Sequence, residues 1–211
     1  MGSPEGIARP PQRRAGSGRR RAGGFTLVEL MIVMVIAAVV LAIGAPQFSE
    51  FRSNNRLSGA SNDLLAALHL ARTEAIKRQR PVAVCATAEP SAAEPSCTAG
   101  PFSGWLVFED LDTDCQRAAG EPRPIRAEGP IDGSLRAAAD GICVAFAPTG
   151  FALDLPVGVE AERVLICDDR GTGLQAGTSQ SAARGISISR TGRASISRDP
   201  DVLASWDLPC S

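Results

Sequence analysis

With 211 residues and a formal net charge of −1, the chain is long enough for one membrane anchor and one modest domain with a true core. Its single histidine and its lack of a Gly-x-Ser-x-Gly or nucleotide-loop motif argue against an enzyme, and no cofactor is expected. The near-neutral balance hides an asymmetry, because residues 1–24 hold six arginines and one acid, which leaves 16 basic and 22 acidic residues downstream.

A basic leader, residues 1–24, precedes an apolar run from Phe25 to Ala45. As a helix this run is ~31 Å long at ~1.5 Å per residue, which matches the ~30 Å hydrocarbon core of a bilayer. We therefore predict a transmembrane helix over residues 25–46 that crosses a membrane once. Because the arginines stay on the cytoplasmic side, the C-terminal domain is expected on the opposite side.

Glu29 interrupts the apolar run near its start. A carboxylate at this depth costs free energy in lipid, so it requires a partner or a function. In an ordinary secretory signal, a cleavage site of small residues follows the apolar run. Here the small residues Gly23 and Gly24 precede it. Cleavage after Gly24 would leave the helix on the mature protein. The alternative is a plain single-pass anchor in which Glu29 lies near the interface and has no role.

Residues 24–30, Gly-Phe-Thr-Leu-Val-Glu-Leu, resemble the processing site of type IV pilins and type II secretion pseudopilins. The resemblance implies that a prepilin peptidase cleaves between Gly24 and Phe25 and that the new Phe25 amine is methylated. It further implies that the helix spans the bacterial inner membrane and that the C-terminal domain lies in the periplasm. It also implies that Glu29, the fifth mature residue, pairs with the amino terminus of a neighbouring subunit. Pro46 falls where such helices often bend, as expected from the loss of a backbone donor.

Downstream of Pro46 the pattern becomes amphipathic, with apolar residues at spacings of three and four. One helix is therefore predicted from about Thr26 to about Arg78. Its second part, within residues 47–80, should pack against a sheet, and Arg80-Pro81 should end it. The apolar stripe consists of Leu57, Ala60, Leu64, Leu68, Ala71 and Ala75.

Residues 81–211 are predicted to form a β-rich domain of short strands joined by turns. The fold class is thus α+β, with a long helix packed on small antiparallel sheets. The predicted strands are Val82–Ala86, Trp105–Phe108, Ile142–Ala147, Arg163–Cys167, Arg184–Ser189 and Ala194–Ser197.

Six cysteines all follow the anchor, namely Cys85, Cys97, Cys115, Cys143, Cys167 and Cys210. An even number in an exported region fits disulfides, whereas the lack of Cys-x-x-Cys and of a second histidine disfavours zinc. About 15 full pairings are open to six cysteines. Cys85–Cys97 is preferred for its short spacing and would pin a loop over residues 87–101; the other four cysteines stay unassigned.

The order of four further segments resembles the GspH/FimT family of minor pseudopilins. These segments are Val82–Cys85 with Cys97, Gly104–Asp110, Ala145–Gly150 and Ser189–Arg193. The resemblance implies a pilin-like fold and a structural subunit that assembles with other pilins or pseudopilins in a filament or at its tip. It fits a type II secretion pseudopilus and a type IV pilus equally, since both use the same anchor and peptidase.

Arg190, Arg193 and Arg198 suggest an alternative function, because clustered guanidinium groups suit phosphate contacts. In the FimT branch of the family, a C-terminal arginine motif is linked to DNA uptake, and Gly192-Arg193 matches part of it. The second closely spaced arginine of that motif is missing here. The acidic balance of the exported part also disfavours DNA binding, which therefore stays the alternative.

Asp110, Asp112 and Asp114, with Glu121 at the twelfth position, have the ligand skeleton of a calcium loop. However, Cys115 occupies the sixth position, where such a loop needs glycine. A solvated acidic loop without a metal is the favoured interpretation, and calcium is the alternative.

Overall fold

The computed structural model describes residues 24–117, 122–156 and 158–210, with side chains for all of these except residues 43–47. The chain divides into two compact units between Ala45 and Pro46. The predicted leader, apart from Gly24, lies outside the described residues.

The long helix α1 runs from Leu27 to Arg78 and crosses the boundary between the two units. Its last turn carries Lys77 and Arg78, whose positive charges favour the negative end of the helix dipole. Gln79 then adopts a positive φ of 55°, and Pro81 follows, so the helix cannot continue. Pro46 lies within α1, and the bend there stays a prediction.

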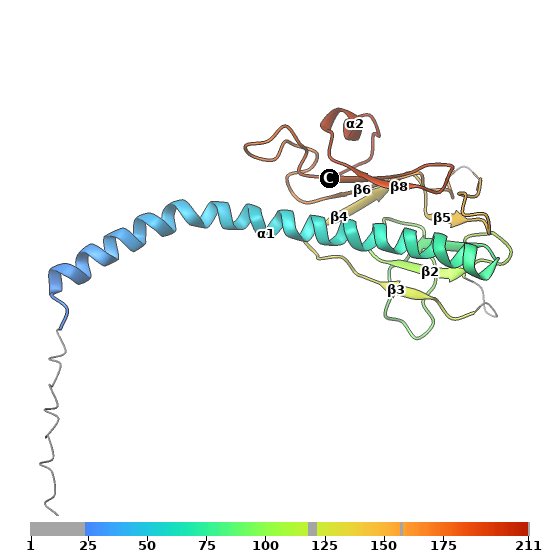
Figure 1. Ribbon diagram of the computed structural model, residues 1–211, viewed down its shortest axis with the longest axis horizontal. Coiled ribbons are helices and arrows are strands. Elements are labelled where there is room, and N and C mark those ends of the chain that lie inside the picture. Colours follow the sequence, from blue (N-terminus) through green and yellow to red (C-terminus); the bar gives the residue numbers. More distant parts are fainter. Residues whose placement is uncertain (1–23, 118–121, 157, 211) are drawn as a thin grey trace, which may run out of the picture. The chain divides into compact units, whose positions relative to one another are not determined.

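Two antiparallel four-stranded sheets follow the helix (Figure 1). The first has the order β3-β2-β1-β5 and the second the order β4-β6-β7-β8. The strands of the first are β1 (Val82–Ala86), β2 (Trp105–Glu109), β3 (Arg126–Glu128) and β5 (Cys143–Phe146). Those of the second are β4 (Arg136–Ala139), β6 (Arg163–Cys167), β7 (Arg184–Ile188) and β8 (Ala194–Ser197), before the short helix α2 (Pro200–Ala204).

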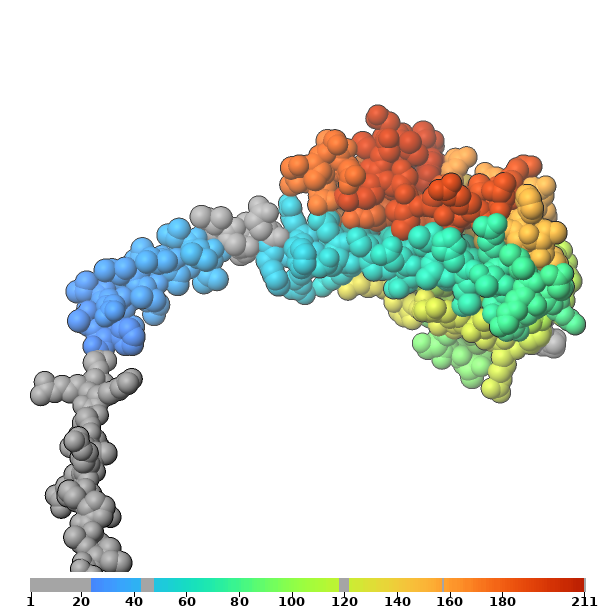
Figure 2. Space-filling model, in the orientation of Figure 1, coloured from blue at the N-terminus to red at the C-terminus, as the bar shows by residue number. Residues whose placement is uncertain are grey.

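The main core lies between the second part of α1 and the inner faces of both sheets. Figure 2 shows this part of α1, in cyan to teal-green, packed against the rest of its unit. Leu57, Leu64 and Leu68 of the predicted stripe are at most 1% exposed. Each buried leucine stabilises the domain by about 1.5–3 kcal/mol through removal of its surface from water. The amphipathic pattern thus directs this part of the helix onto the sheets.

Each disulfide fastens a covering segment to the outer face of a sheet. Cys85–Cys97 is the pair that the sequence favoured, with the two Cα atoms 5.6 Å apart. The remaining pairs are Cys115–Cys143 and Cys167–Cys210, with Cα separations of 6.1 and 6.2 Å. In every pair one cysteine belongs to a strand and packs on its outer side, and the other lies in a loop or tail. These covers explain why the central strands are buried on both faces.

The six predicted strands are present, with boundaries that differ by one residue at most. The prediction missed β3, β4 and α2. β3 has only three residues, two of them charged, and β4 is mostly alanine, so neither has the alternation or the β-branched residues that signal a strand. Their strand conformation comes from pairing with β2 and β6.

Candidate assembly site

Residues 24–26 precede α1 and lead into an N-terminal cap. The hydroxyl of Thr26 accepts a hydrogen bond from the backbone N–H of Glu29 at 3.1 Å. A threonine at the cap with glutamate three residues later is the pairing of a capping box, which satisfies donors that the first helical turn leaves free. Glu29 therefore lies in the first turn, where its negative charge favours the positive end of the helix dipole.

The first part of α1 exposes apolar side chains on every side. Phe25 is 76% exposed, and the large apolar residues between Leu27 and Leu41 are 54–74% exposed. Figure 2 shows the near face of this part of the helix in blue. Such a surface is far more apolar than a soluble monomer carries, so it marks an interaction segment.

The sequence predicts a membrane span over residues 25–46. Among the residues that the structure describes, no helix is both long and apolar enough to cross a membrane.

Two of the segments that carry the family resemblance meet beside the second part of α1. The N–H of Ala152 donates to the carbonyl of Arg190 at 3.1 Å, which joins the turn after β5 to the turn after β7. Gly192 has a φ of 74°, and a Cβ there would lie 2.1 Å from the carbonyl oxygen of Gly150. Arg72 of α1 lies against both glycines. Glycine is therefore required at this contact by conformation and by space.

The family model described as Type II transport protein GspH matches residues 60–192, more than half of the chain. The chain belongs to the GspH family. A second model, the prokaryotic N-terminal methylation motif, matches residues 19–45 and so includes Gly24, Phe25 and Glu29. No curated protein matches the chain.

Two crystal structures of the type IV minor pilin FimU from Pseudomonas aeruginosa strain PAO1 are similar to the chain. One, in space group P65, is 19% identical, covers 74% of this chain and 98% of its own, and gives a TM-score of 0.46. The other, in space group P21, is 22% identical, covers 76% and 98%, and gives a TM-score of 0.48.

GspH family membership and the methylation motif identify the chain as a structural subunit of the minor pilin or pseudopilin kind. The predicted family and the predicted α+β fold are thereby confirmed. Gly24 and Phe25 precede α1 and Glu29 lies in its first turn, whereas their roles in processing and assembly stay predictions.

The arginines of the DNA-binding alternative do not form one free surface in this GspH-type domain. Arg190 lies 3.5 Å from the carboxylate of Asp154, and Arg193 is exposed at the β7–β8 turn. Arg198 is partly buried and donates to the side chain of Gln175 and, at 3.3 Å, to the carbonyl of Ser181. The comparisons give DNA binding no support.

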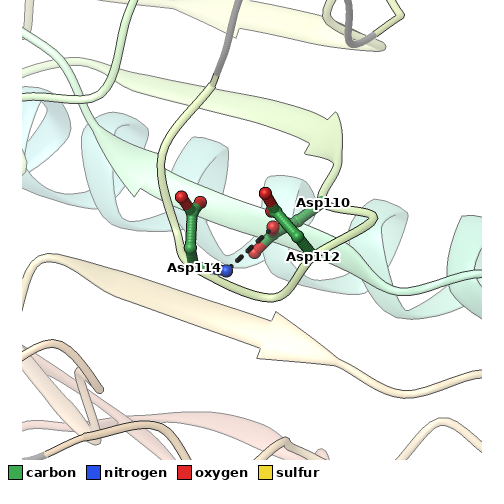
Figure 3. A group of neighbouring side chains, drawn as sticks. All are labelled: Asp110, Asp112 and Asp114. Atoms are coloured by element: carbon green, nitrogen blue, oxygen red, sulfur yellow. Dashed lines mark hydrogen bonds between the residues drawn. The ribbon is translucent and has the colours of Figure 1, made fainter.

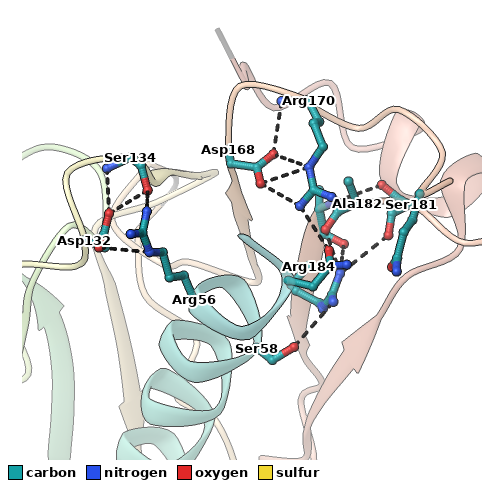
Figure 4. A network of polar contacts seen from close by, with 12 residues as sticks. Arg56, Ser58, Asp132, Ser134, Asp168, Arg170, Ser181, Ala182 and Arg184 are labelled. Atoms are coloured by element: carbon teal, nitrogen blue, oxygen red, sulfur yellow. Dashed lines mark hydrogen bonds and ion pairs between the residues drawn. The ribbon is translucent and has the colours of Figure 1, made fainter. Parts of the chain in front are cut away.

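A fourth arginine, Arg184, is only 5% exposed and holds the loop before β7 to α1 (Figure 4). It donates to the carbonyl of Ala182 at 2.6 Å and to the hydroxyl of Ser58 at 3.4 Å. Burial lowers the pKa of its guanidinium to about 10, and the charges of Arg198 and Arg170 act in the same direction. Arg184 is thus still charged at neutral pH and has a structural role that the sequence did not reveal.

The acidic loop after β2 brings three of the four calcium candidates together (Figure 3). Asp110, Asp112 and Asp114 each offer an oxygen, and these atoms lie within 4.8 Å of one another. Asp110 is fully buried, and its carboxylate accepts the N–H groups of Asp114 at 3.2 Å and Cys115 at 3.1 Å. Glu121 lies outside the described residues. The Asp110 carboxylate therefore shapes the loop itself, and calcium binding stays a prediction.

Proposed function

We propose that this GspH-family chain is a minor subunit of a type II secretion pseudopilus or a type IV pilus, anchored in the inner membrane before it enters the filament. The observation that carries the proposal is a helix exposed on all sides, entirely apolar from Leu30 to Leu41, with one carboxylate in its first turn. Lipid and the equivalent helices of other subunits are the two environments that would cover such a surface.

Cleavage between Gly24 and Phe25 by a prepilin peptidase is the first step of this function. Both residues are exposed and precede the helix, so the peptide bond that joins them lies outside regular hydrogen-bonded structure. Removal of the leader takes away its six arginines and leaves the apolar helix at the start of the mature chain. The new Phe25 amine, methylated or not, then supplies a positive charge next to apolar surroundings.

Glu29 would pair with that amine on a neighbouring subunit. Between Phe25 and Phe51 the sequence holds no lysine or arginine, and the next basic side chain is Arg52. None of the ion pairs in the described residues involves Glu29. An unpaired carboxylate would cost ~2.5 kcal/mol or more in the bilayer centre, so pairing favours one vertical register between subunits.

Substitution Glu29→Ala tests the proposal, with Glu50→Ala as a matched loss of one acid from the same helix. We expect both variants to be cleaved and to fractionate with the inner membrane. Only Glu29→Ala should fail to co-purify with the other pilin subunits. Co-purification of Glu29→Ala at the level of the unaltered chain would contradict the assembly role of this carboxylate.

A further inference from the structure

The second sheet ends on β4, whose outer edge has no neighbouring strand among the residues that the structure describes. Such an edge presents unpaired N–H and C=O groups, and proteins usually protect it with charges, proline or a covering segment. The outer edge of β5 is covered, because Leu153 donates to the carbonyl of Ala145 at 2.9 Å and Ala161 to that of Cys143 at 2.7 Å. β4 carries three consecutive alanines after Arg136, and no strand among the described residues pairs with its outer edge.

The register shows which backbone groups of β4 point outward. Asp140 donates to the carbonyl of Arg163 at 3.2 Å, one step beyond the pair Ala139↔Val164. Hydrogen-bonded pairs alternate along an antiparallel ladder, so Ala138 also bonds to β6, whereas Ala137 and Ala139 face away. The hydrogen bonds between β6 and β7 lead to the same result. Ile188 donates to the carbonyl of Glu162 at 2.8 Å, so the even-numbered residues of β6 bond to β7 and the odd-numbered ones bond to β4.

The outward groups of Ala137 and Ala139 face a slot and not an open surface. A pocket of about 520 Å³ runs along β4, with Gly100, Pro101, Ser103 and Pro209 on its other walls. Ala137 and Ala138 are only 9% and 8% exposed. Outside the sheet ladder, no backbone hydrogen bond in the described part of the chain uses Ala137 or Ala139.

We propose that this slot binds an extended segment of another pilin subunit, which adds a strand to β4. The outward donors and acceptors repeat every second residue, about 6.8 Å apart, and only another extended main chain matches that spacing. The alanine walls admit small side chains. Arg136 is the one charged residue among those that line the slot, and it already pairs with Asp169 at 2.6 Å, so the incoming segment needs no acidic residue at that end.

A second copy of this chain is not the occupant. Its own β4 is recessed in the same way between segment 100–103 and Pro209, so two such edges do not reach each other. A protruding strand or chain end from a different subunit fits the slot. The inference rests on the proposed filament function, because a filament places other subunits within reach of β4.

Proline at Ala139 tests the role of the outward backbone. Ala139→Pro removes an N–H that β6 does not use, and edge strands tolerate proline at such positions. Ala139→Ser is the matched control, since it changes the side chain and keeps the N–H. From detergent-solubilised cells, the tagged proline variant should recover about ten-fold less of the other pilin subunits, and the serine variant should stay within about two-fold of the unaltered chain.

Hydrogen exchange on the unaltered chain provides a second readout that needs no substitution. In the purified mature chain the amides of Ala137 and Ala139 should exchange faster than those of Ala138 and Asp140. In assembled filaments they should exchange about ten-fold more slowly than in the purified chain. Unchanged exchange in filaments, or concentration-dependent protection in the purified chain alone, would overturn the inference.

The outcomes separate this inference from the proposed function. If the unaltered chain recovers no other pilin subunit, the filament function fails and the inference fails with it. If the unaltered chain and Ala139→Pro, with the same melting temperature, recover equal amounts, only the strand addition at β4 is wrong. Loss of recovery in both Ala139 variants would show that side-chain space, and not the outward N–H, decides binding.

Discussion

Leu30 and Leu64 belong to the same helix, yet Leu30 is 55% exposed and Leu64 is fully buried. Leu64 lies within an amphipathic pattern whose polar residues keep the other faces of the helix in water. Leu30 begins an apolar run in which no polar residue follows Glu29 until after Leu41. The difference shows that the two parts of one helix have different environments: the second part forms the core of the subunit, and the first part is exposed in the isolated chain.

The largest expected effect comes from exchanging these two leucines for alanine. Leu64→Ala should lower the free energy of unfolding by about 2–5 kcal/mol, because it leaves a cavity between α1 and the sheets. Leu30→Ala should leave this free energy unchanged, since its side chain touches no core. Denaturant unfolding in detergent, followed by the fluorescence of buried Trp105, measures both. Equal losses would show that the first part of α1 contributes to the fold of the subunit.

Substitution of two glycines, one packed and one open to solvent, should change the free energy of unfolding by less. A Cβ at Gly185 in β7 would lie 2.2 Å from Cδ2 of Leu203 and 2.5 Å from Cζ3 of Trp206. Gly185→Ala should therefore cost about 1–2 kcal/mol of stability by lifting the C-terminal segment. At Gly59 in α1 a Cβ would meet nothing within 4 Å, so Gly59→Ala should stabilise by up to about 1 kcal/mol. Unchanged stability in Gly185→Ala would contradict the tight cover over β7, and a loss of stability in Gly59→Ala would contradict the free space at that position.

The smallest effect is the pH dependence of the sheet domain. Burial alone would raise the pKa of Asp168, but hydrogen bonds and the charge of Arg170 hold it below the ordinary 3.8. The folded state thus binds this proton less readily than the unfolded state, so the contribution of Asp168 is present at neutral pH and is lost as the pH falls below about 4. Asp168→Asn should flatten the acid limb of a plot of unfolding free energy against pH.

Glu160 provides a control of opposite sign. Burial and the nearby charges of Glu162 and Asp154 raise its pKa, against a hydrogen bond from Leu155 and the charge of Arg190. Its ionised form is therefore unfavourable in the folded state, and Glu160→Gln should increase stability at neutral pH. Acid limbs of the same slope in both variants would contradict the assigned causes.

Local signals predicted most of the long helix and the central strands. The apolar spacing of three and four from Leu57 to Ala75 predicts a helix, and short apolar runs such as Val82–Ala86 predict strands. The processing motif, residues 24–30, is likewise contiguous. β3 and β4 lack such signals because pairing with β2 and β6, and not their own residues, makes them strands.

Features that depend on distant parts of the chain stayed hidden in the sequence. Cys115–Cys143 and Cys167–Cys210 join residues 28 and 43 positions apart, and no spacing rule selects these pairs. The buried contacts of Arg184 with α1 depend on tertiary packing. The slot along β4 depends on which backbone groups face away from β6 and on segments distant in the chain, and the alanine side chains of β4 indicate neither.

The mass of the mature chain isolated from bacterial membranes or filaments tests the central claim most directly. We predict an amino terminus at Phe25, with a methylated amine, and retention of the apolar helix that follows it. A chain that keeps its leader, or one that begins after Ala45, would contradict the account, because either would remove the free amine or the exposed helix on which assembly depends.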